Sequence, residues 1–133
     1  MIRYVIISIS GGILFGVLDA VLNANPLAQK LYAVYKPIMR ARISPALGTV
    51  IDLAYGFILA GIFLLLVQSL PGDTGFLKGL SYGLLIWFFR VVMYGATQYV
   101  MFNISFSLLL YIIVSGLLEM MIIGVFFGIT LKP

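Results

Sequence analysis

The chain has 133 residues, of which 63% are hydrophobic and 9% are charged, and its net charge is +4. Soluble domains carry about 25% charged residues, so a chain this apolar cannot cover itself with polar surface in water. Because the sequence contains neither cysteine nor histidine, disulfides, thiol chemistry, histidine-ligated haem and the usual zinc sites are excluded. We expect a single all-α membrane domain over residues 1–133, with no cofactor, no metal site and no nucleic-acid partner.

The first expected transmembrane helix covers residues 4–22. Glycines and Asp19 interrupt this apolar stretch and no small-x-small cleavage site follows it, so we expect a retained helix rather than a signal peptide. Asn25 and Pro26 then supply a helix cap and a first-turn proline. Apolar residues at helical spacing predict a short amphipathic helix over residues 26–36, lying in the membrane interface. An ordinary polar loop is the alternative.

Three further transmembrane helices are expected over residues 45–70, 76–100 and 105–130. Each is long enough to cross about 30 Å of hydrocarbon with some tilt. The composition of residues 71–75, Pro-Gly-Asp-Thr-Gly, predicts a tight turn. Asn103 or Ser105 is expected to cap the fourth helix. The predicted fold is therefore a polytopic four-helix transmembrane bundle.

The distribution of basic residues predicts the orientation of this bundle. Arg3 lies near the N-terminus and favours placing that end inside. The loop over residues 24–44 outweighs it, because it holds four basic residues and no acid: Lys30, Lys36, Arg40 and Arg42. By the positive-inside rule this loop is cytoplasmic and both termini lie outside, in a plasma or inner membrane. The four basic side chains are also the expected contacts for anionic lipid headgroups.

Four charged residues fall inside the expected transmembrane helices: Asp19, Asp52, Arg90 and Glu119. Each alone at the bilayer centre would cost about 2.5–3.5 kcal/mol, so we expect them to point into the bundle and to pair. The planar fork of arginine suits a carboxylate, and we expect Arg90 to pair with Asp52 or Asp19. One arginine cannot neutralise three acids. Either a second cation binds, or one acid, best Glu119, is protonated.

Small residues are expected to mark close contacts between the helices. They stand in pairs four residues apart: Gly12 and Gly16, Gly79 and Gly83, Gly124 and Gly128. Helical spacing places Asp19 on the glycine face of the first helix, Asp52 on that of the second and Arg90 on that of the third. Gly124 and Gly128 lie on a different face from Glu119, where either another helix of the chain or a second copy could pack. The pattern also allows two tandem hairpins related by duplication, although chance placement of glycine explains it equally.

Three interpretations of the charged cluster remain open. The charges can fix the register of the helices, form a pathway for protons or cations, or contact a partner or lipid headgroup. We predict a non-catalytic membrane subunit or scaffold. The alternative is a small proton- or cation-linked transporter or channel, acting as a homo-oligomer because four helices rarely enclose a pathway alone. A lipid-acting enzyme ranks third, since histidine and cysteine are lacking. The expected partners are the bilayer and either a second copy or a membrane-complex subunit.

Overall fold

The computed structural model describes residues 2–38 and 45–131, and every element in these ranges is helical. In chain order the elements are α1 (Ile2–Asn23), α2 (Pro26–Leu31), the 3₁₀ helix η1 (Tyr32–Ile38), α3 (Pro45–Leu66), α4 (Gly75–Trp87), the π-helix η2 (Phe88–Val92), α5 (Met93–Met101) and α6 (Phe106–Thr130). Four of these stretches are long and apolar enough to cross a membrane: α1, α3, α4 to α5 taken together, and α6. The predicted all-helical class with four candidate membrane helices is confirmed.

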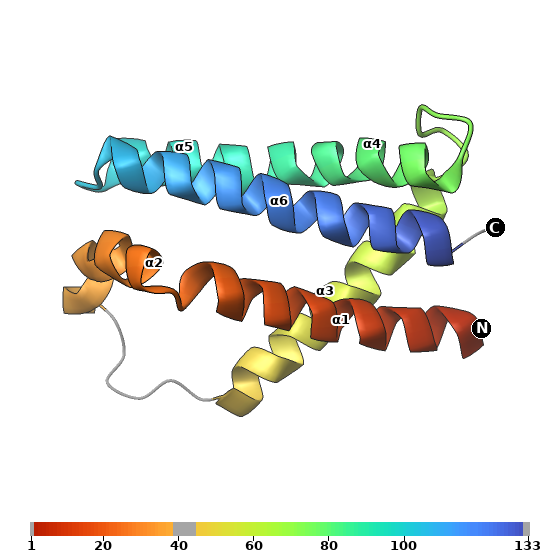
Figure 1. The fold of residues 1–133 in the computed structure, drawn as a ribbon, viewed down its shortest axis with the longest axis horizontal. Helices are drawn as coiled ribbons and strands as arrows, with labels where there is room; N and C mark the ends of the chain where they lie inside the picture. The colour runs from red at the N-terminus through yellow and green to blue at the C-terminus, as the bar shows by residue number, and fades with distance from the viewer. Residues whose placement is uncertain (1, 39–44, 132–133) are drawn as a thin grey trace.

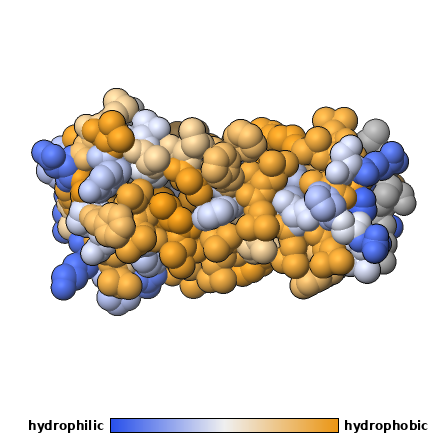
Figure 2. Space-filling model, turned by 90° about the horizontal axis from the view of Figure 1, so that it is seen from above, coloured by the Kyte–Doolittle hydropathy of each residue, from blue (hydrophilic) through white to orange (hydrophobic). Residues whose placement is uncertain are grey.

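The molecule is an elongated bundle with a polar region at each end. The start of α1, the turn before α4 and the end of α6 lie at one end, while α2 and the start of α6 lie at the other (Figure 1). Hydrophilic residues gather at these two ends, and apolar residues cover most of the band between them (Figure 2). This surface is what a helix bundle in lipid requires, because lipid tails cannot solvate polar side chains.

The hairpin of α4 and α6 is held by a continuous line of glycines, which we call the glycine seam. A Cβ on Gly79 would lie 2.8 Å from the Cα of Val125 and would overlap the backbone of Gly124. A Cβ on Gly128 would in turn lie 2.9 Å from the Cα of Gly79. The two backbones are therefore in direct contact, the arrangement that small-xxx-small patterns produce in lipid. Gly124 and Gly128 are thus used inside the chain.

The hairpin of α1 and α3 has a different geometry, because α3 crosses α1 obliquely (Figure 1). The two helices touch where Gly56 meets Gly12, and a Cβ on Gly56 would lie 2.6 Å from the backbone nitrogen of Gly12. A Cβ on Gly16 would lie 2.9 Å from Oδ2 of Asp52. On the other side of the crossing, the Tyr4 hydroxyl donates a hydrogen bond of 2.7 Å to the backbone oxygen of Phe57.

Aromatic side chains join the two hairpins. Tyr82 of α4 is fully buried, and its hydroxyl donates a hydrogen bond of 2.6 Å to the backbone oxygen of Leu59 in α3. Its ring packs edge-on against Phe63 with 5.2 Å between centroids. Phe127 of α6 contacts Phe63 and lies where a Cβ on Gly11 of α1 would stand. Tyrosine suits this position because its ring fills the apolar interior while its hydroxyl reaches a backbone acceptor.

The segment after α1 departs from the predicted single helix over residues 26–36. Asn25 caps α2 as expected, its Oδ1 accepting a hydrogen bond of 2.9 Å from the backbone of Ala28. The α-helix ends at Leu31, however, and continues as the 3₁₀ helix η1. Pro37 supplies a physical reason, because a proline inside an α-helix clashes with the preceding turn and removes a hydrogen bond.

The remaining helix ends are fixed by side chains. Ser105 caps α6 as predicted, accepting a hydrogen bond of 3.1 Å from the backbone of Leu108. Thr74, which the sequence placed only in a turn, caps α4. The expected second helix ends at Leu66 rather than at residue 70, and Lys78 donates hydrogen bonds of 2.6 and 3.4 Å to the backbone oxygens of Val67 and Leu70. This lysine therefore satisfies carbonyls that follow a helix end.

Candidate functional site

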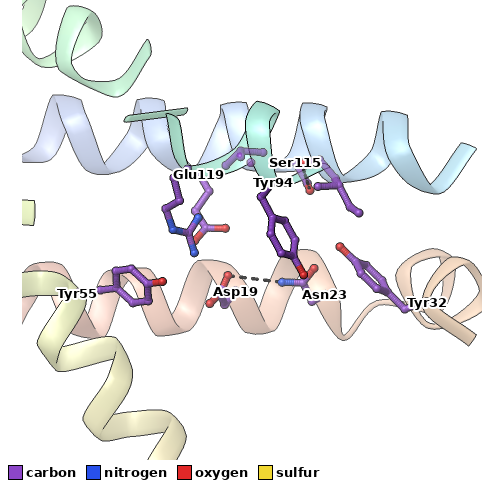
Figure 3. Close-up of a pocket in the computed structure, with 11 residues that line it drawn as sticks. Asp19, Asn23, Tyr32, Tyr55, Tyr94, Ser115 and Glu119 are labelled. Carbon is purple, nitrogen blue, oxygen red and sulfur yellow. Dashed lines mark hydrogen bonds between the residues drawn. The ribbon is translucent and has the colours of Figure 1, made fainter. Parts of the chain in front are cut away.

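A cavity of about 320 Å³ lies between α1, α6 and the segment formed by η2 and α5, and we call it the polar cleft. Tyr55 of α3 also lines it (Figure 3). Its polar lining residues are Asp19, Asn23, Tyr32, Tyr55, Arg90, Tyr94, Ser115 and Glu119. Three of the four charges predicted inside the membrane helices are thus brought to one cavity, from three different helical segments.

Glu119 is the most deeply buried of these charged residues, with 4% of its surface exposed. It projects from α6 into the polar cleft and faces Asp19 of α1 (Figure 3). Within residues 2–38 and 45–131, its Oε1 atom is buried and accepts no hydrogen bond. An unpaired buried acceptor is destabilising, so this oxygen is a strong candidate for contact with something that enters the cleft.

Asp19 is half-buried on the opposite wall of the polar cleft. Its Oδ1 atom accepts a long hydrogen bond of 3.5 Å from the side-chain amide of Asn23, one turn further along α1 (Figure 3). A bond at that length constrains the carboxylate weakly. Asp19 and Glu119 interact electrostatically and lie close enough for their side chains to share a hydrogen bond, and two carboxylates that meet in this way favour a shared proton or a bound cation.

Arg90 does not form the ion pair that we predicted. In the described part of the chain, no ion pair joins it to Asp19 or Asp52, and its Nε atom is buried without a hydrogen-bond partner. Its guanidinium carbon lies 4.8 Å from the ring centre of Phe15 and 5.0 Å from that of Tyr55. These two rings are themselves stacked, with 4.9 Å between centroids. Arg90 is thus held mainly by cation–π contact.

Asp52 is the one predicted charge that does not line the polar cleft. Its carboxylate lies against Gly16, on the contact surface between α1 and α3. It still interacts electrostatically with Asp19, Arg90 and Glu119, so the four charges form one cluster. Asp52 does share the glycine face of its helix.

Asp19 shares the face of Gly12, since residues seven apart on the regular helix α1 differ by about 20° around its axis, but this face meets different partners along its length. For Arg90 the predicted glycine face was wrong, because the π-helix η2 interrupts the regular spacing. Gly12 and Gly16 of α1 contact α3, whereas Asp19 lines the cleft. Gly79 contacts α6, whereas Arg90 points into the cleft.

The π-helix η2 explains the orientation of Arg90. In this segment the backbone N–H of Met93 bonds to the oxygen of Phe88, five residues earlier. A π-turn inserts one residue into a helix and often occurs at functional sites. Here it places Val91 against Gly116 of α6 and leaves Arg90 and Tyr94 facing the cleft. Residue spacing alone predicts a regular α-helix here and gives no sign of the π-turn.

Tyrosines surround the mouth of the polar cleft on the side of η1. A second cavity of about 450 Å³ shares Asn23, Tyr32 and Tyr94 with the cleft and extends it to Tyr35. The Tyr35 hydroxyl donates a hydrogen bond of 3.1 Å to Gln98 of α5, which ties η1 to the bundle. Burial raises the pKa of Tyr32 to about 12, so its hydroxyl stays protonated at neutral pH.

The remaining predicted contacts lie away from the cleft. Lys30 and Lys36 are exposed on α2 and η1, at the end of the bundle where a headgroup would be met. Arg40 and Arg42 lie outside the described residues. Within the described ranges, no group of three or more carboxylates is placed to hold a metal ion.

Comparison of the chain with family models, with curated proteins and with solved structures finds no match. The chemistry of the polar cleft is therefore the basis for a functional interpretation. It combines two carboxylates, one arginine held by aromatic rings and three tyrosines in one cavity of an apolar bundle.

Proposed function

We propose that this chain is a small membrane transport protein that binds a cation in the polar cleft and exchanges it with a proton on Glu119. The observation that carries the proposal is the Oε1 atom of Glu119. Among the described residues it has no hydrogen-bond partner, although its side chain is buried and lines an open cavity. Buried polar atoms are almost always paired, and exceptions cluster at binding and catalytic sites.

The arrangement of Arg90 supports transport over a purely structural lock. A cluster that only fixed helix register would be expected to pair its arginine with a carboxylate, because unpaired buried charges are strongly destabilising. Arg90 instead lies over Phe15 and Tyr55, and no ion pair to it is recorded in the described ranges. The carboxylates of Asp19 and Glu119 are therefore left to bind a proton or cation.

The topology that we propose follows from the basic segment. The second cavity leads from the cleft toward η1, which carries Lys36 and follows the helix that carries Lys30. By the positive-inside rule this end is cytoplasmic, and the start of α1 and the end of α6 then face outward. We further propose that copies of the chain associate, because one four-helix bundle leaves little room for a complete pathway.

The test is a flux assay in liposomes containing the purified protein and an internal pH-sensitive dye. When a cation gradient is imposed, wild-type protein should change the pH of the lumen. Cation entry should alkalinise the lumen, and cation exit should acidify it. Glu119→Gln keeps the size and one oxygen of the side chain but cannot titrate, so it should reduce the flux at least tenfold. Asp73→Asn is the matched control, since Asp73 is an exposed acid outside the cleft and its loss should leave the flux unchanged.

A scaffold remains the second candidate because Arg90 bridges Phe15 of α1 and Tyr55 of α3. Arg90→Met distinguishes the two functions. If wild-type liposomes show no flux above empty liposomes while Arg90→Met prevents folding, the charges serve structure and the transport proposal is wrong. If Glu119→Gln abolishes flux in a protein that keeps its helical circular dichroism, the transport proposal stands.

A further inference from the structure

We propose that the cation bound in the polar cleft is an organic ammonium ion, a protonated primary or secondary amine with a short apolar body. This inference rests on the proposed function and names its class of substrate. Three features of the cleft carry it: its volume, its acceptors and its aromatic rings.

The volume of the polar cleft exceeds what a proton or a bare inorganic ion requires. Its 320 Å³ lies at the lower end of the range for small-molecule sites, which begins near 300 Å³. A single water occupies about 30 Å³ of liquid volume. The cleft therefore has room for an amine with a short alkyl or aryl group, and Val91 and Ile112 supply apolar contacts in the lining.

The acceptors of the cleft match the donors of an ammonium group. Protonated primary amines carry three N–H donors and no acceptor, like the lysine side chain. Glu119 and Asp19 approach from opposite walls, and the Oε1 atom of Glu119 has no partner among the described residues (Figure 3). With Arg90 counted, the lining still carries one formal negative charge in excess. A bound ammonium ion would restore neutrality inside an apolar bundle.

The aromatic rings point to an organic rather than an inorganic cation. Cations stabilised by Tyr, Trp or Phe faces within about 6 Å are typically guanidinium and ammonium groups. Arg90 demonstrates this behaviour in the same cleft, where its guanidinium stands 5.0 Å from the Tyr55 ring. Tyr32 and Tyr94 line the cleft as well, at the point where the second cavity joins it. An amine entering from the η1 end would pass between carboxylate acceptors and ring faces.

The ligand set also disfavours a dedicated metal site. Within the described residues, no three carboxylates stand close enough to hold a metal ion together. Hard inorganic cations such as Ca²⁺ prefer six or more oxygen ligands at short, regular distances. Two carboxylates that come together from two helices, beside a cavity of about 320 Å³, suit a larger ion that brings its own donors.

The experiment measures binding and flux with n-butylammonium chloride, against potassium chloride at equal ionic strength. In detergent, n-butylammonium should raise the thermal unfolding midpoint of the wild-type protein saturably, whereas potassium should not. In liposomes, an n-butylammonium gradient should drive a pH change that is faster with wild-type protein than in protein-free or Glu119→Gln liposomes, where only the neutral amine crosses the bilayer. Asp19→Asn should weaken n-butylammonium binding at least tenfold, because it removes one of the two carboxylates.

Tyr94→Leu tests the aromatic contribution. Tyr94 is 56% exposed, so its replacement is compatible with folding. Loss of one ring face should weaken n-butylammonium binding about three- to tenfold, while Tyr94→Phe should bind like wild type. Tyr99→Leu is the matched control on the same helix, since Tyr99 packs against Phe106 outside the cleft.

The outcomes separate the two proposals. If Glu119-dependent proton flux occurs but n-butylammonium binds no better than potassium, the ammonium inference is overturned and the proposed function stands. If n-butylammonium binds equally well to wild type, Tyr94→Leu and Asp19→Asn, it binds outside the cleft and the inference is also overturned. If no flux occurs with any cation, the proposed function itself fails.

Discussion

The two hairpins of this bundle use glycine in different ways, and the difference explains where the charges gather. Along the α4–α6 glycine seam, one glycine after another keeps the two backbones in contact, so no side chain fits between them. In the α1–α3 hairpin, Gly12 and Gly56 make one close crossing, and α3 then diverges from α1 (Figure 1). The polar cleft lies where the helices diverge, and Tyr55 and Asp19 line it.

Lengthening one side chain in the glycine seam should have the largest effect. A Cβ on Gly79 would lie 2.8 Å from the Cα of Val125, so Gly79→Ala must separate two backbones along their length. We expect a loss of about 1–3 kcal/mol or more in the free energy of unfolding, measured by denaturing-detergent titration in mixed micelles.

Gly48→Ala is the control for this comparison. A Cβ on Gly48 meets nothing within 4 Å in the described structure, and alanine favours helix over glycine. It should leave the free energy of unfolding unchanged or raise it slightly. Equal losses for Gly79→Ala and Gly48→Ala would show that the seam does not exclude side chains.

Gly56→Ala should have a smaller effect on stability than Gly79→Ala. Its Cβ would lie 2.6 Å from the Gly12 nitrogen, but the contact is a single crossing about which α3 can pivot. We expect a loss of about 1–2 kcal/mol, measured in the same titration. Tyr55 and Asp52 belong to α3, so a pivot of this helix in Gly56→Ala should change the affinity for the cation severalfold. In folded Gly79→Ala protein that affinity should stay nearly unchanged. If Gly79→Ala changed cation binding more than Gly56→Ala does, the pivot of α3 about the Gly12–Gly56 crossing would be refuted.

Ser8→Ala should have a smaller effect than Gly56→Ala, with the opposite sign. Ser8 is fully buried beside the α1–α3 crossing, and its hydroxyl has no partner within the described ranges. Removing an unsatisfied buried hydroxyl should raise the free energy of unfolding by up to about 1 kcal/mol. The same titration checks it. A clear loss of stability would mean that the Ser8 hydroxyl does have a hydrogen-bond partner at the α1–α3 crossing.

Most of the fold follows from the sequence because lipid imposes one strong constraint. Backbone polar groups inside hydrocarbon must be satisfied by helices, so apolar length alone locates α1, α3 and α6. Local chemistry located the caps at Asn25 and Ser105. The change to a 3₁₀ helix after Leu31 was missed, since it depends on how η1 packs against Gln98 and Tyr111 as well as on Pro37.

The residues of the candidate site were found more readily than their arrangement. Charges inside apolar stretches are rare enough to identify Asp19, Arg90 and Glu119 directly. Their partners could not be predicted, because helical spacing assumed regular helices and pairing by charge alone. The stacked rings of Phe15 and Tyr55 compete for Arg90, and such competition is set by the three-dimensional packing.

Because the segment Phe88–Val92 is a π-turn, the number of residues in it matters to this site as well as their identity. Gly79 and Gly95 both contact α6, although residues 16 apart in a regular α-helix differ by about 160° around its axis. The inserted residue takes up about 100° of that rotation. A one-residue deletion in this turn would therefore restore a regular α-helix and leave Gly95 and Tyr94 near their present faces, while the side chains of the turn itself, Arg90 among them, would change direction. An insertion or deletion in this segment would therefore change the proposed cation site through the direction of several side chains at once, whereas a substitution changes one.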